Sequence, residues 1–194
     1  MRHFHKLCLA LCATGSLLLT GCQQYVKPQP PTESQTPQVQ NQFSLQGKIG
    51  VRTPQQSGSA FFSWAQQQDN FDIELSGILG VGKTQIEGKP GQVTLNSAKT
   101  GLIQAETAEE LLQRATGWQA PISHLVHWVQ ARPATLNAQL NKDQLLRPLQ
   151  IIEDGWVVNL SYDENALLPS KLILKQALES GQENRITMLI QNRE

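Results

Sequence analysis

The sequence predicts a mainly β protein of the α+β class: an unclosed antiparallel β-barrel with inserted helices that close an apolar cavity. Two observations predict this fold. Short segments that alternate apolar and polar residues follow one another from Phe43 to Thr107 and return over residues 149–192. A helical stretch interrupts them after Thr107. A long antiparallel sheet must curl, and inserted helices must bury their apolar stripes on it.

The N-terminal residues have the features of a secretory signal peptide. A basic start, MRHFHK, precedes an apolar run at residues 7–19, which is shorter than the about 20 residues that a membrane-spanning helix needs. The run ends in LTGC, residues 19–22, which resembles the lipobox of bacterial lipoproteins. By that resemblance Cys22 becomes the acylated first residue of the mature chain. The alternatives are a short buried helix, or a signal cut elsewhere that leaves Cys22 as a lone thiol in an oxidising compartment.

Composition divides the chain into three parts. Residues 1–21 form the predicted signal peptide, residues 22–41 the acylated cysteine with a flexible tether, and residues 42–194 a single domain. The tether is rich in Gln, Pro, Ser and Thr, and such a segment cannot bury enough apolar surface to fold. Gln23 follows the cysteine, whereas Asp at that place is associated with inner-membrane retention in enterobacterial lipoproteins. We therefore expect a lipid anchor on the periplasmic side of the outer membrane of a Gram-negative bacterium.

Charge and cysteine content exclude several classes of protein. The chain has 16 basic and 16 acidic residues, and loss of Arg2 and Lys6 with the signal leaves a slight acidic excess. Without a basic patch, nucleic-acid binding has no electrostatic basis. Cys8 and Cys12 leave with the signal, so we expect no disulfide and no thiolate metal site in the mature chain.

The first half of the domain is expected to contain six strands, separated by turns such as RTPQQSG and GKPG. They are expected at residues 43–51, 59–66, 70–77, 83–88, 91–97 and 101–107. Apolar residues at every second position of the first three strands share one face of the sheet. The residues that we expect on the inner face are Leu45, Ile49, Phe62, Trp64, Ile73 and Leu75.

Two helices follow the sixth strand. Thr107 and Glu110 form a capping box, and the helix that they begin ends near Gly117. Pro121 can open a second helix at residues 121–130, whose apolar stripe is Ile122, Leu125, Val126 and Val129. Strands return at residues 149–163, with EDGW as a tight turn, and at residues 168–177 and 184–192.

Two motifs suggest chemistry that we do not expect. His124 and His127 have a spacing that can bind a metal, but a site needs further ligands, and helix-surface or helix–sheet histidines are the favoured interpretation. The letters of Gly77–Thr84 match a phosphate-binding loop, but a strand and a glycine-rich turn follow instead of the required helix. No serine has the context of a nucleophile elbow, so we predict no enzymatic activity and no cofactor beyond the lipid on Cys22.

Several segments together resemble the LolB family of outer-membrane lipoprotein receptors. They are the lipobox, the tether, FSLQGKIGVR, SAFFSWAQQQDNFDIELSGILGVGKTQIEG, AETAEELLQRATGWQAPISHLVHWVQARP and LPSKLIL. The resemblance implies the LolA/LolB-like fold and a monomeric lipoprotein-binding domain at residues 42–194. It implies that the domain accepts client lipoproteins from the periplasmic carrier LolA and inserts them into the outer membrane. The six inner-face residues are then candidates for the lining of an acyl-chain cavity.

The family also carries a protruding loop with an exposed leucine that delivers lipoproteins to the bilayer. The matching position is Leu79, and Ile78 adds apolar area beside it. Relatives often have Asn-Pro before the leucine, whereas Gly77 and Ile78 stand here. The alternative function is a structural or assembly lipoprotein of the outer membrane with a packed core. A lipid-acting hydrolase ranks last, because no pair of nucleophile and base is visible.

Overall fold

Eleven antiparallel strands form one continuous sheet in the residues that the computed structural model describes, 41–77, 82–117 and 119–194. The predicted signal peptide, the Leu79 segment and the predicted tether up to residue 40 lie outside these residues. The strands are β1 (Gln42–Arg52), β2 (Ser57–Gln67), β3 (Asn70–Ser76), β4 (Lys83–Lys89), β5 (Gln92–Ser97), β6 (Gly101–Ala105), β7 (Gln139–Lys142), β8 (Pro148–Glu153), β9 (Trp156–Ser161), β10 (Lys171–Ala177) and β11 (Glu183–Arg193).

The order of strands explains why the sheet is open. It runs β6-β5-β4-β3-β2-β1-β11-β10-β9-β8-β7, so β6 and β7 are the two edges within the described residues. Except for β6 and β7, strands that are neighbours along the chain pair with each other, and the one further pairing joins β1 to β11 at the centre. This arrangement confirms the predicted unclosed antiparallel sheet.

Alternation of side chains gives the sheet one apolar face. On β2, Ala60, Phe62, Trp64 and Gln66 are buried, while the residues between them are exposed. The same alternation holds on β9, β10 and β11. Burial of these apolar side chains therefore determines which face of the sheet is the inner one. A register slip of one residue would place them on the outer face.

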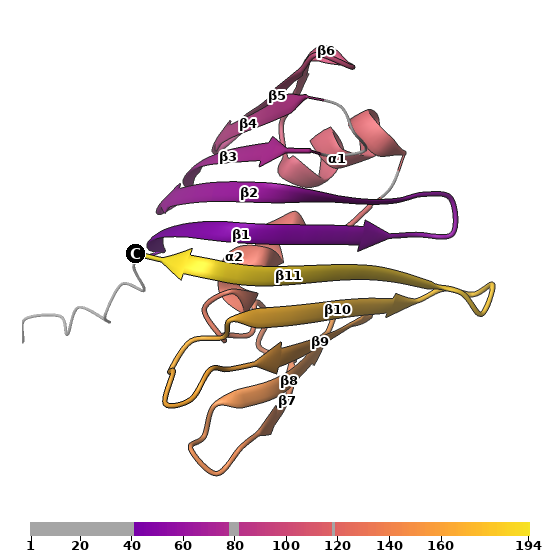
Figure 1. Ribbon diagram of the computed structural model, residues 1–194. Coiled ribbons are helices and arrows are strands. Elements are labelled where there is room, and N and C mark those ends of the chain that lie inside the picture. The colour runs from indigo at the N-terminus through magenta and orange to yellow at the C-terminus, as the bar shows by residue number, and fades with distance from the viewer. Residues whose placement is uncertain (1–40, 78–81, 118) are drawn as a thin grey trace, which may run out of the picture. The chain divides into compact units, whose positions relative to one another are not determined.

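Both helices lie on the same side of the sheet (Figure 1). Helix α1 (Ala108–Thr116) begins at Thr107, whose side chain accepts a hydrogen bond from the Glu110 amide, and ends at Gly117, which has a φ of 72°. Helix α2 (Ile122–Trp128) is shorter than the predicted residues 121–130. Among the described residues, no helix is long and apolar enough to cross a membrane.

Two expectations from the sequence are corrected in detail. The side chain of Glu110 accepts a hydrogen bond from the Glu106 amide, one residue before the predicted partner Thr107. Strand β7 was not predicted, because its residues QLNK lack an apolar period and all four are exposed. By contrast, the EDGW turn is confirmed: Asp154 and Gly155 both have positive φ, as a two-residue hairpin turn requires.

Candidate functional site

The six predicted interior residues lie together on the inner face of β1, β2 and β3. The register places Trp64 between Leu45 and Ile73, and Phe62 between Gly47 and Leu75. Leu45, Phe62 and Trp64 are buried, while Ile49, Ile73 and Leu75 are partly buried and pack against the same cluster. The structure thus brings all six into one apolar surface. Their role as an acyl-chain lining stays a prediction.

Helix α2 covers this apolar surface. Leu125, Trp128 and Val129 are buried in the cluster that contains the inner-face residues, and Ile122 and Val126 pack against it. The predicted stripe therefore faces the sheet, and Trp128 joins it. The other half of the sheet contributes further buried residues to the cluster, namely Ile151, Trp156, Val158, Leu160, Leu172, Leu174, Ile186, Met188 and Ile190.

A pocket of about 500 Å³ lies between α1 and the β9–β10 side of the sheet. Trp156, Ala120 and Pro121 provide its apolar surface, and the first two belong to the buried cluster. Its polar lining comes from Glu109, Glu110, Gln113, Arg114, Gln119 and Gln176. The pocket therefore borders the edge of the apolar interior. Trp156 was not singled out in the sequence, although it begins the alternation of Trp156, Val158 and Leu160 after the tight turn.

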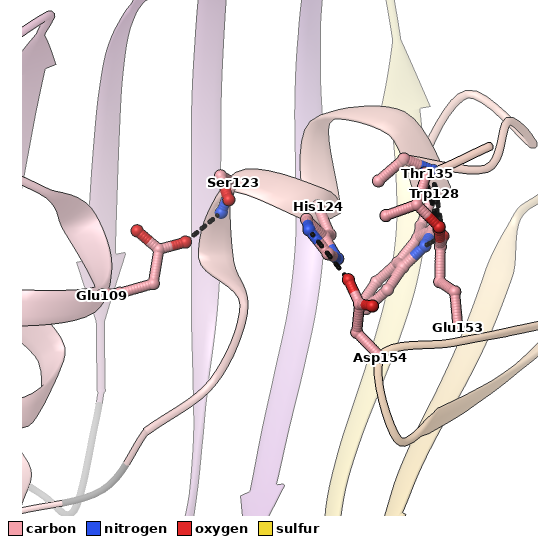
Figure 2. Close-up of polar contacts among 8 residues, drawn as sticks. Glu109, Ser123, His124, Trp128, Thr135, Glu153 and Asp154 are labelled. Carbon is pink, nitrogen blue, oxygen red and sulfur yellow. Dashed lines mark hydrogen bonds and ion pairs between the residues drawn. The ribbon is translucent and has the colours of Figure 1, made fainter. Parts of the chain in front are cut away.

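Polar contacts hold the first turn of α2 on two sides (Figure 2). At its start, the Ser123 amide donates to Glu109 of α1 over 2.7 Å. On its other side, His124 Nε2 lies 3.6 Å from the Asp154 carboxylate in the β8–β9 turn. The second ring nitrogen of His124 is buried and has no partner within the described residues. Helix α2 is thus fastened to α1 and to the far half of the sheet by separate carboxylates.

Glu153 is the buried carboxylate of this region. It accepts hydrogen bonds from the Trp128 indole, from the Ala134 and Thr135 amides and from the Thr135 hydroxyl. Burial alone would raise the pKa of Glu153, but these donors outweigh it and hold the pKa below its ordinary value. Glu153 is therefore a charged hydrogen-bond acceptor that holds the segment following α2 in place.

The two histidines of α2 take part in packing and polar contacts. The His124 ring meets the Trp128 ring edge to face, with centroids 5.4 Å apart. Burial, followed by the charges of Arg132 and His124, lowers the pKa of His127, against a smaller opposing effect of Glu153. No group of three or more His, Cys, Asp or Glu side chains in the described part of the chain is placed to hold a metal ion.

Ile78, Leu79 and Cys22 lie outside the described residues. The segment with Ile78 and Leu79 joins β3 to β4, and an ion pair of 2.6 Å between Lys83 and Glu74 links these two strands. A strand, β4, begins at Lys83. This confirms that the letters of a phosphate-binding loop lack the helix that such a loop needs.

Comparisons with known proteins agree with this geometry. A sequence model of the family described as "Outer membrane lipoprotein LolB" matches residues 41–192. The chain is 40% identical over 154 residues to the outer-membrane lipoprotein LolB of Stutzerimonas stutzeri, covering 77% of this chain and 72% of that protein. It is 40% identical over 156 residues to the LolB of Pseudomonas syringae pv. syringae, covering 77% and 73%.

A solved structure shows the same fold at low sequence identity. The LolA superfamily protein of Nitrosomonas europaea superposes with a TM-score of 0.52 at 12% identity, covering 80% of this chain and 86% of that one. The family model matches most of the described residues, and the match to each of the two LolB relatives covers more than two thirds of the relative's own length. This chain belongs to the LolB family of outer-membrane lipoproteins.

Proposed function

We propose that this protein accepts lipoproteins from a periplasmic carrier of the LolA type and inserts them into the outer membrane. Members of the LolB family act as receptors in the localisation of lipoproteins to that membrane. The observation that carries the proposal is the apolar inner face, which is covered by α2 and bordered by the pocket at Trp156. No enzymatic step and no cofactor is part of this proposal.

The physical task is to keep acyl chains out of water during transfer. Each buried methylene of an acyl chain contributes about 0.8 kcal/mol, so exposed chains are strongly disfavoured. The inner face offers apolar contacts without directional bonds, and clients that share only their lipids need no more than this. A pocket of about 500 Å³ is within the range of about 300–1,000 Å³ that is usual for ligand sites.

In this proposal, acyl chains enter the interior where helix α2 makes its weakest contacts with its surroundings. The fully buried residues of the cluster, such as Leu45, Trp128 and Val129, leave the centre of the interior packed. The contacts between α2 and its surroundings at Glu109 and Asp154 are single interactions with partly exposed groups. We infer that acyl chains enter beside Trp156 at the first turn of α2, because the contacts that hold this turn are weaker than the central packing.

A transfer assay tests the proposal. A soluble form of the mature chain, with Cys22 replaced, is mixed with LolA loaded with a lipoprotein, and the position of the client is read by pull-down. We expect the client to move to this protein. A client that stays on a competent carrier would refute the receptor function. A photo-cross-linking residue in place of Trp156 should capture the client, whereas the same residue at the exposed edge-strand position Leu102 should not.

The segment with Ile78 and Leu79 is proposed to deliver the client to the bilayer. Leu79→Glu is expected to leave folding and client binding intact and to block release into membrane, because a carboxylate cannot enter the apolar layer. Normal insertion by Leu79→Glu would exclude this role of Leu79.

The packed centre of the cluster favours a second candidate, a structural lipoprotein without a ligand. Uptake of an apolar dye that lipoprotein competes away would exclude it. A protein that takes up no dye and accepts no client would support it.

A further inference from the structure

Four leucines are exposed on two connecting segments at one end of the sheet. Leu145 and Leu146 lie in the β7–β8 connection, with exposed fractions of 66% and 74%. Leu167 and Leu168 lie in the β9–β10 connection, with exposed fractions of 79% and 38%. We call these four residues the leucine patch. The apolar interior does not use them, so their exposure calls for another explanation.

Direct contacts hold the two segments side by side. The Arg147 guanidinium donates a hydrogen bond of 2.6 Å to the Ala166 carbonyl and lies 4.5 Å from the centre of the Tyr162 ring. The Tyr162 hydroxyl donates to the Pro148 carbonyl over 2.7 Å. Each contact joins the β7–β8 hairpin to the β9–β10 connection. The two pairs of leucines therefore lie on neighbouring segments that are bonded to each other.

The backbone of the β7–β8 connection presents its leucines rigidly. The Asp143 carboxylate accepts hydrogen bonds of 2.9 Å from the Leu145 and Arg147 amides and is ion-paired with the Arg147 side chain. Leu146 has a φ of 63°, a conformation that suits glycine or asparagine better than leucine. Folding alone does not favour an exposed leucine there. A preformed apolar turn, however, loses little entropy when it docks.

The leucine patch lies at the end of the sheet where β1 begins and β11 ends (Figure 1). Arg193 of β11 donates to the Pro169 carbonyl, next to Leu168, over 3.2 Å. Arg193 is also the register partner of Leu45, four residues after Asn41. The chain that leads to Cys22 therefore enters the domain at this end.

The predicted tether sets how far this end can be from the lipid anchor. Residues 23–40 separate Cys22 from the first described residue, and a flexible chain of that length spans roughly 20–25 Å. Docking of the patch to the same bilayer is then intramolecular, so a weak apolar contact suffices. Charges near the patch balance, since Lys142, Arg147 and Lys171 stand against Asp143, Asp163 and Glu164.

We propose that the leucine patch docks the domain on the bilayer that holds its lipid anchor. The proposal rests on acylation of Cys22 but not on the receptor reaction. The pocket residues Trp156 and Gln176 lie toward the opposite ends of β9 and β10. A domain docked through the patch therefore turns its pocket to the periplasm, where a loaded carrier arrives. The tether allows the domain to leave this position for the proposed delivery of the client.

Environment-sensitive labels test the proposal in the acylated, full mature chain. The chain is reconstituted in vesicles of phosphatidylethanolamine with a minor share of phosphatidylglycerol, and flotation verifies the anchor. A fluorophore is attached to Leu145→Cys, Leu167→Cys or the control Leu136→Cys. Leu136 is fully exposed, and its neighbour Thr135 is bound to Glu153 at the other end of β8. We expect a blue shift and quenching by chain-brominated lipids at 145 and 167, and neither at 136, independent of salt.

A second variant tests whether the four leucines act together. Leu146→Asn with Leu168→Asn should abolish the blue shift of the label at 145 and leave the melting temperature unchanged, because both side chains are exposed and asparagine accepts the backbone of position 146. Each leucine removed is expected to weaken docking about tenfold.

Several outcomes would overturn the proposal. Labels at 145 and 167 that behave like the label at 136 would do so. A shift that needs the carrier or a high protein concentration, but no vesicles, would show that the patch meets a protein instead. A mature chain that proves not to be acylated at Cys22, and so does not float, would remove the anchor on which the docking depends. A failed transfer assay with normal quenching would contradict the receptor function alone.

Discussion

Gly47 has no room for a side chain in the central pairing of β1 with β11, and Gly47→Ala is expected to lower the stability of the domain markedly. A Cβ at this position would lie 1.9 Å from the Leu189 carbonyl oxygen and 3.0 Å from a ring carbon of Phe62. Ordinary contact begins at 3.4 Å, so the separation from the carbonyl must grow by the difference, 1.5 Å. The obstacle is backbone, which cannot turn aside as a side chain can.

The cost follows from the position of Gly47. Overpacking in a core typically costs about 1–3 kcal/mol, and we expect about 3 kcal/mol because a central strand pair must separate. In a domain of this size the melting temperature falls by about 2–4 °C for each kcal/mol. The expected decrease is therefore about 6–12 °C.

Thermal unfolding followed by circular dichroism measures this effect on the soluble mature chain. Gly50→Ala is the matched control on the same strand, because the nearest atom to its added Cβ is 3.9 Å away. Gly50→Ala should change the stability by less than about 0.5 kcal/mol. Equal melting temperatures for the two variants would refute the account of the β1–β11 contact.

Three smaller predictions follow from the helical cover. Glu153→Ala should destabilise the protein by about 3 kcal/mol, since it leaves the buried donors of Trp128 and Thr135 unpaired. The pKa of Glu153 in the folded state is below 4.5. Its contribution to the free energy of unfolding is therefore complete above pH 4.5 and is lost as the pH falls through the folded pKa. Chemical unfolding of Glu153→Ala should show a smaller loss of stability over this pH range than the wild type. The pKa of His127 in the folded state is below 6.5, so on acidification the unfolded state binds the proton first. At pH values below about 6.5 the free energy of unfolding should therefore decrease in the wild type, and it should decrease less in His127→Gln. Thr107→Ala removes the cap of α1 and should cost about 1 kcal/mol in the same assay, and no loss would exclude the cap as a stabilising contact.

Periodicity made most of the fold predictable. Alternation on β2 and β3 placed Phe62, Trp64 and Ile73 on one face, and Thr107 and Gly117 marked both ends of α1. These signals are local, because burial on one face and the capping of free amides each act within a few residues.

What the sequence did not reveal depends on contacts between distant segments. Strand β7 exists because the partner β8 supplies its hydrogen bonds, although its own residues are polar. The pocket at Trp156 requires α1 to approach β9 and β10. The paired leucines of the patch were visible as residues 145–146 and 167–168, but their proximity depends on the contact between Arg147 and Ala166.

The single pairing of β1 with β11 determines how the sheet can assemble. Every other strand pair joins segments that follow each other along the chain, so each half of the sheet is a meander that closes only short loops. The seam from Leu45 with Arg193 to Arg52 with Arg185 closes a loop of nearly the whole domain. The entropic cost of closing this loop arises in a single step, when β1 pairs with β11. This step can occur only after the last residues have been synthesised. Truncation before β11 would therefore leave two separate meanders. Each would have an additional unpaired edge strand, β1 in one and β10 in the other.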